Sequence, residues 1–188
     1  DSTVVKYAKN LCGPCNSSFT QPFDKAYETF VAKAMEQRQQ IIERRVIDFE
    51  SIYDAEWEAG QRNLFKYFAK CFGCRLNEAG RTVSDDVIAL LSKDAFTTAL
   101  YVTFMVNEDF HRLEIDHVGT EPLIVHRDRA SGRDVGFQSG HAVGWLTMMY
   151  WYGHFPLQPI GARWVADAKH VYLGRYRPLD AVIADSAS

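Results

Sequence analysis

The fold is expected to be organised around a stretch that begins with Leu11-Cys12-Gly13-Pro14-Cys15 and ends with Lys70-Cys71-Phe72-Gly73-Cys74. These two Cys-x-x-Cys pairs contain the four cysteines of the chain. Between Asp24 and Ala59 there is no Gly or Pro, and apolar residues recur at helical spacing. This pattern predicts one long amphipathic helix, which ends at Gly60 and is followed by a second helix over residues 61–72.

The C-terminal half has shorter and more varied elements. Ser84-Asp85-Asp86 is typical of a helix start. The helical spacing continues to about Val106, although β-branched and aromatic residues allow a strand in its last part. Further on we expect two short strands, at 113–118 and 122–126, and a hairpin turn at 127–133. Two later segments, at 141–152 and 164–176, could be helix or strand.

These elements predict an α-rich α+β fold. A long amphipathic helix and a helical hairpin make up the N-terminal half, and the C-terminal half is mixed and rich in aromatic residues. We expect one domain over residues 1–188, with sub-regions at 1–83 and 84–188.

Composition excludes two classes of partner. The chain has 188 residues, of which 47% are hydrophobic and 24% charged, with a formal net charge of -3. It therefore has no basic footprint for nucleic acid. The richest apolar run, from Val143 to Phe155, is shorter than the roughly 18–20 residues of a membrane span.

The cysteines predict a staple, as a zinc site or as two disulfides, with unlinked thiols as the third reading. Two Cys-x-x-Cys units suit tetrahedral zinc with Zn–S distances of about 2.3 Å. The 36 residues from Asp24 to Ala59 rise ~54 Å as a helix, the returning helix recovers ~18 Å, and an extended arm over 12–23 covers ~40 Å. The pairs therefore meet if the N-terminal arm runs alongside the long helix. The predicted metal ligands are Cys12, Cys15, Cys71 and Cys74.

Two resemblances give enzymatic readings of the first pair. Cys12-Gly13-Pro14-Cys15 resembles the thioredoxin redox motif, which implies a dithiol redox role. Cys12 to Phe19 also resembles the nucleophile segment of the papain-like cysteine proteases, and Gly140-His141-Ala142-Val143 resembles the segment of their catalytic histidine. This second resemblance implies Cys15 as nucleophile and His141 as base, with Asp167 orienting the histidine because no asparagine follows it.

Two other clusters suggest metal chemistry. His126-Arg127-Asp128 with His170 resembles the iron triad of the 2-oxoglutarate oxygenases, which implies Arg175 or Arg177 as the residue that binds the co-substrate carboxylate. The stretch from Glu108 to His117 is dense in acidic and histidine side chains, which can hold a metal or form a solvated surface.

The enzymatic readings need different residues and different folds, so at most one of them holds. The sequence favours a non-catalytic interaction or assembly subunit of a larger complex, whose partners are other protein chains or further copies of itself. A helix of ~54 Å is longer than the ~32 Å expected for a globule of this size, and the excess predicts contact with another chain. If the chain is an enzyme, the reading that remains is a cysteine hydrolase.

Overall fold

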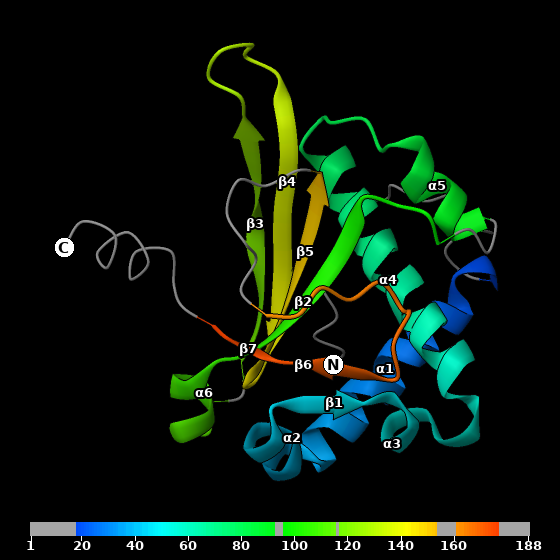
Figure 1. Cartoon of the computed structure of the whole chain (residues 1–188), viewed down its shortest axis with the longest axis vertical. Helices are drawn as coiled ribbons and strands as arrows, with labels where there is room; N and C mark the ends of the chain where they lie inside the picture. The colour runs from blue at the N-terminus through cyan, green and yellow to red at the C-terminus, as the bar shows by residue number, and fades with distance from the viewer. Residues whose placement is uncertain (1–17, 93–95, 116, 154–160, 177–188) are drawn as a thin grey trace.

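A sheet with helices packed on one of its faces makes up most of the molecule (Figure 1). The computed structural model describes residues 18–92, 96–115, 117–153 and 161–176. The helices are α1 (Gln21–Glu36), α2 (Arg38–Arg44), α3 (Phe49–Tyr53), α4 (Trp57–Glu78), α5 (Asp85–Ser92) and α6 (Glu108–Arg112). The strands are β1 (Val46–Asp48), β2 (Leu100–Val106), β3 (Val118–Arg127), β4 (Asp134–Val143), β5 (Leu146–Gly153), β6 (His170–Tyr172) and β7 (Gly174–Arg175).

The α-rich expectation is wrong. Of the described residues, 46% are helical and 30% are in strands, so the fold is a balanced α+β. A five-stranded sheet has the order β3-β4-β5-β2-β7, and a two-stranded sheet pairs β1 with β6. The segments over 141–152 and 164–176 that could have been helix or strand contribute to β4, β5, β6 and β7.

The long helix predicted from Asp24 to Ala59 is also wrong. It is interrupted at Gln37, and the chain turns at Arg45, whose φ of 55° lies in the left-handed region. Val46 and Ile47 then pair with β6 as a strand, because two β-branched residues suit a strand and Ile47 is fully buried there. Asp48 ends the strand and caps α3 by accepting a hydrogen bond from the Glu50 amide at 3.0 Å.

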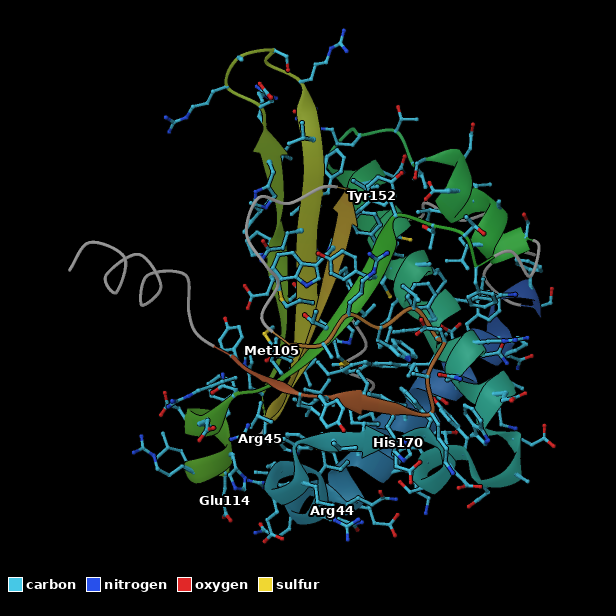
Figure 2. All side chains as sticks on the ribbon, in the orientation of Figure 1. Arg44, Arg45, Met105, Glu114, Tyr152 and His170 are labelled. Atoms are coloured by element: carbon cyan, nitrogen blue, oxygen red, sulfur yellow. The ribbon has the colours of Figure 1, made fainter. Side chains whose placement is uncertain are left out.

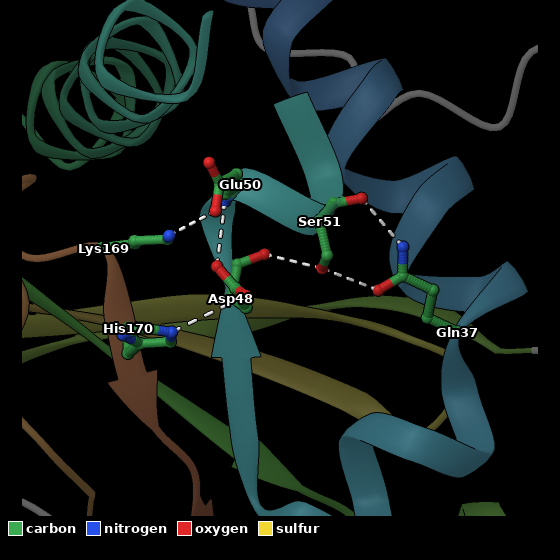
Figure 3. A network of polar contacts seen from close by, with 6 residues as sticks. All are labelled: Gln37, Asp48, Glu50, Ser51, Lys169 and His170. Carbon is green, nitrogen blue, oxygen red and sulfur yellow. Dashed lines mark hydrogen bonds and ion pairs between the residues drawn. The ribbon is translucent and has the colours of Figure 1, made fainter. Parts of the chain in front are cut away.

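A polar network holds this folded-back segment in place (Figure 3). The side-chain Nε2 of Gln37 donates to the Ser51 backbone carbonyl at 2.9 Å, and the Ser51 hydroxyl donates to Gln37 Oε1 at 2.9 Å. On the other side, Lys169 pairs with Glu50, and the Phe49 amide donates to the Lys169 carbonyl at 2.9 Å. The break in the helix is therefore fixed by contacts to residues far along the chain.

The prediction that a helix ends at Gly60 is wrong, because Gly60 lies inside α4. A Cβ at this position would come within 2.3 Å of Cγ of Tyr53, so the glycine lets the Tyr53 ring lie directly on the helix. The Tyr53 hydroxyl continues across to donate to the Ala26 carbonyl of α1 at 2.8 Å. Gly60 thus serves close packing between α3 and α4.

Because there is no single long helix, helix length no longer indicates contact with another chain. The longest described helix, α4, has 22 residues and spans ~33 Å, about the diameter expected of the whole domain. Over the described residues, no helix combines the length and the apolar character needed to cross a membrane.

Two predictions about local structure are confirmed. A helix begins after Ser84, as α5, and the connection from β3 to β4 is a tight turn over residues 128–133. Asp128 accepts hydrogen bonds from the amides of Ala130 and Ser131 at 2.7 and 2.8 Å, which fixes this turn.

The core lies between the helices and one face of the large sheet. Phe104 of β2 packs against Phe30 of α1, Phe68 of α4 and Trp164, with ring centroids 5.6, 6.0 and 5.3 Å away. All four rings are buried. Because helices cover this face of the sheet, a binding site on the sheet has to lie on the opposite face.

Candidate functional site

The predicted cysteine site is only half within the described residues. Cys12 and Cys15 lie outside them. Cys71 and Cys74 are buried in α4, and the pair lies on one turn of this helix. Burial raises the pKa of the Cys74 thiol. The four-cysteine site stays a prediction.

His141 is locked between two tyrosines. Its Nε2 lies 2.8 Å from the Tyr27 hydroxyl of α1, and its Nδ1 is hydrogen-bonded to the Tyr150 hydroxyl of β5. The side chain is 4% exposed. Burial, with a smaller contribution from the charge of Arg75, lowers the pKa of His141 from 6.5 to about 3.

This arrangement differs from what the protease resemblance implies. A general base works best with a pKa near the operating pH and needs access to the proton that it takes. His141 has neither property, and a tyrosine occupies each ring nitrogen, including the one that Asp167 was expected to orient. Cys15 lies outside the described residues. His141 therefore joins α1 to the sheet rather than lining an open site.

The residues of the predicted iron triad lie apart. His126 is on β3 and faces Gln138, whereas His170 is on β6 of the small sheet, 3.6 Å from Asp48. Asp128 fixes the β3–β4 turn. Among the residues that the structure describes, no group of three or more His, Cys, Asp or Glu side chains is placed to hold a metal ion. Arg177 and Asp116 lie outside that part of the chain.

A half-open cavity of about 510 Å³ lies where β2 ends and α6 begins, and we call it the α6 cavity. Its floor includes Gly119, Ala142 and Thr147, which stand opposite one another in neighbouring strands β3, β4 and β5. Directly opposed residues share a face of a sheet, and His141, next to Ala142, faces the helices. The α6 cavity therefore lies on the sheet face that points away from the helices.

The walls of the α6 cavity come from both sides of this floor. One wall includes Glu108, Asp109 and Phe110 of α6, and another includes Glu121 of β3 with Arg175 and Tyr176 at the end of β7. His117 packs over the floor, since a Cβ at Gly119 would come within 2.2 Å of its Nε2. Small residues in the floor leave the space open.

Ion pairs neutralise two of the three carboxylates in the walls. Glu108 is hydrogen-bonded to Arg45, which Figure 2 labels beside α6, and lies 4.0 Å from Arg175. The hydrogen bond from Arg45 lowers the pKa of Glu108. Asp109 pairs with Arg112 at 3.0 Å.

Glu121 has a different environment. It accepts a hydrogen bond from the Tyr176 hydroxyl at 3.0 Å, and within the described ranges no basic side chain pairs with it. Burial, the charge of Glu121 and this hydrogen bond together raise the pKa of Tyr176 to about 12, so the phenol remains a donor at neutral pH.

The sequence singled out part of this site for another reason. The stretch from Glu108 to His117 was noted as metal-capable, and it contributes Glu108, Asp109, Phe110 and His117 to the lining. Glu121, Thr147 and Tyr176 were missed, because only the pairing of β3, β4, β5, β2 and β7 brings them to that stretch. No local pattern marks them.

Comparison with known proteins adds no relative. No protein-family model, curated protein or solved structure matches the chain. The site is therefore interpreted from its own geometry.

Proposed function

We propose that this chain is a non-catalytic interaction module that binds another protein chain at the α6 cavity. The observation that carries the proposal is the position of the cavity beside a group of exposed apolar residues. Leu113 and Ile115 are 61% and 37% exposed, and they lie between the lining residues Phe110 and His117 along the chain.

Exposed apolar side chains next to a half-open cavity that contains polar groups suit a protein partner better than a small molecule. Contiguous apolar surface on a soluble domain is covered at contact sites, and such sites combine apolar contacts with a few polar groups. A small ligand in the α6 cavity would leave Leu113 and Ile115 in water. A partner chain covers both features at once.

The cysteine staple belongs to the same proposal. Cys71 and Cys74 are three residues apart on α4, a spacing that places two side chains on one face of a helix. Two thiolates from one helical turn can supply half of a tetrahedral zinc site, with Cys12 and Cys15 as the other half. Native mass spectrometry tests this: one zinc per chain is expected, and its persistence in a Cys71→Ser, Cys74→Ser variant would contradict the staple.

Selection of peptides against the folded chain tests the binding site. A random peptide library displayed on phage is selected on the full chain and then assayed on the variant Ala142→Leu, which fills the cavity floor. Ala130→Leu is the matched control, because Ala130 is exposed in the turn at the far end of the same hairpin. Circular dichroism and urea unfolding establish that both variants are folded.

The proposal expects peptides that bind the parent chain and the Ala130→Leu variant but not Ala142→Leu. Binders that are all insensitive to Ala142→Leu would contradict it. Sedimentation velocity on the chain alone shows whether a second copy of this chain is such a partner, since the Ala142→Leu variant would then dissociate.

A further inference from the structure

We propose that the α6 cavity receives a basic side chain of the partner, with Glu121 as its counter-ion. This inference rests on the proposed function and adds the chemical class of the group that is bound. It follows from which polar groups in the cavity have their hydrogen-bonding and charge requirements met by the chain itself.

The first observation is the unequal pairing of the three carboxylates. Arg45 and Arg175 face Glu108, and Arg112 faces Asp109. Among the described residues, Glu121 receives only the neutral Tyr176 hydroxyl, on Oε1, and its second oxygen accepts no hydrogen bond from them. A carboxylate fixed by one neutral donor is the position at which an added cation gains most.

The second observation is Thr147. It is 1% exposed and lines the cavity, and its hydroxyl oxygen has no hydrogen-bond partner within the described part of the chain. A buried polar atom without a partner is costly, and native proteins rarely leave one unless something else pairs with it. Thr147 therefore points independently to a ligand that has a hydrogen-bonding group here, because a hydroxyl can accept or donate.

The separation of the two groups indicates the size of the ligand. Glu121 stands opposite Gly140, which stands opposite Met149, two residues along β5 from Thr147. Strand spacing and rise place the backbones of Glu121 and Thr147 about 12 Å apart. A single ammonium or guanidinium group does not span this distance, but a basic side chain and the peptide N–H groups next to it do.

The remaining lining favours a guanidinium over an ammonium group. Phe110, His117 and Tyr176 place aromatic rings around the cavity, and Phe110 and His117 already pack edge to face with centroids 5.4 Å apart. A planar guanidinium stacks on aromatic rings and binds a carboxylate through two N–H groups. Arg175 does not exclude a cation, because Glu108 lies 4.0 Å from its guanidinium.

Peptides from the phage selection provide the test. A peptide that depends on the cavity is synthesised with arginine, lysine or citrulline at the enriched basic position, and its affinity is measured by isothermal titration calorimetry. Citrulline keeps the shape of arginine and removes its charge. The arginine peptide is expected to bind at least about tenfold more tightly than the citrulline peptide.

The variant Glu121→Gln should remove this difference, and the control Glu58→Gln, at an exposed carboxylate of α4, should keep it. If the lysine and arginine peptides bind with equal affinity, the site accepts either basic group. If the lysine peptide binds more weakly, the site is specific for a guanidinium group. Peptides that require the open cavity but contain no basic residue, or that bind equally with citrulline, would overturn this inference and leave the proposed function standing. If no selected peptide depends on the cavity, the proposed function itself fails.

Discussion

Tyr27 of α1 and His141 of β4 share a hydrogen bond of 2.8 Å although they are 114 residues apart in the chain. On the other side of the ring, His141 is bonded to Tyr150 of β5. The three side chains form a polar connection through a mostly apolar core, between the helical layer and the middle of the sheet. Because both tyrosine hydroxyls depend on one imidazole, its removal affects both layers.

Replacement of His141 with leucine is expected to lower the free energy of unfolding by roughly 2–5 kcal/mol. Each buried tyrosine hydroxyl then loses its partner, at about 1–3 kcal/mol apiece. Urea unfolding measures the change, and His170→Leu, at an exposed histidine 3.6 Å from Asp48, serves as control with an expected change under about 1 kcal/mol. Equal effects of the two substitutions would contradict a structural role for the Tyr27–His141–Tyr150 connection.

The pKa of His141 predicts a specific dependence of stability on pH. The folded-state pKa, about 3, lies below the ordinary value of 6.5. Below pH 6.5 the unfolded chain therefore binds a proton that the folded chain does not, and the free energy of unfolding falls by up to about 1.4 kcal/mol for each pH unit down to about pH 3. The measurement is the difference in pH slope between the parent chain and His141→Leu, and identical slopes over this window would refute the assignment.

Two glycines of α4 should respond to alanine in opposite directions. Gly60→Ala is expected to destabilise the fold by about 1–3 kcal/mol, because the new Cβ would meet the Tyr53 ring at 2.3 Å. Gly73→Ala should stabilise it by about 0.5–1 kcal/mol, since the nearest atom, in Val83, is 3.6 Å away and alanine favours a helix. Thermal unfolding of both variants checks the signs, and a stabilising Gly60→Ala would show that Tyr53 does not lie on the helix.

Asp86 is expected to be the most sensitive polar residue of α5. It accepts hydrogen bonds from the Thr98 hydroxyl, the Ala99 amide and the Tyr152 hydroxyl at 2.7, 3.0 and 2.9 Å. Burial raises the pKa of Asp86, but the hydrogen bonds outweigh this effect and lower the pKa to about 2. Its contribution is therefore present above pH 3.8 and is lost as the pH falls through about 2.

Asp86→Ala should cost about 2–3 kcal/mol at neutral pH, and Asp86→Asn less, because asparagine keeps one acceptor oxygen. Its exposed neighbour provides the control: Asp85→Ala removes only a favourable charge at the helix start and should cost under about 1 kcal/mol. Urea unfolding at pH 7 gives all three values. A loss no larger for Asp86 than for Asp85 would contradict this account.

Local chemistry predicted some elements of the fold and failed for others. The helix start after Ser84 and the turn after Arg127 depend on nearby residues and could be predicted from the sequence. Val46 and Ile47 continue the helical pattern of the preceding residues, and only the partner strand β6, more than 120 residues away, makes them a strand. A glycine inside a helix reads as a break unless the ring that packs on it is known, as with Gly60 and Tyr53.

The candidate site was less predictable than the fold. His141 was noted as a catalytic base, but its burial between two tyrosines depends on the packing of α1 against the sheet. Glu121 and Thr147 lie in strands whose sequence has no distinctive motif. Strand register alone places both of them at the cavity near α6. Residues that act together only through register leave no spacing in the sequence to detect.

The most direct measurement of the central claim is a map of backbone amide chemical shifts while a selected arginine peptide is added to the ¹⁵N-labelled chain. We expect the largest shifts at Gly119, Glu121, Thr147 and Arg175, which line the α6 cavity from three strands, β3, β5 and β7. In the Glu121→Gln variant the same peptide should produce these shifts only at concentrations about tenfold higher. Shifts confined to other parts of the molecule, such as the exposed face of α5 around Ile88, would contradict the account.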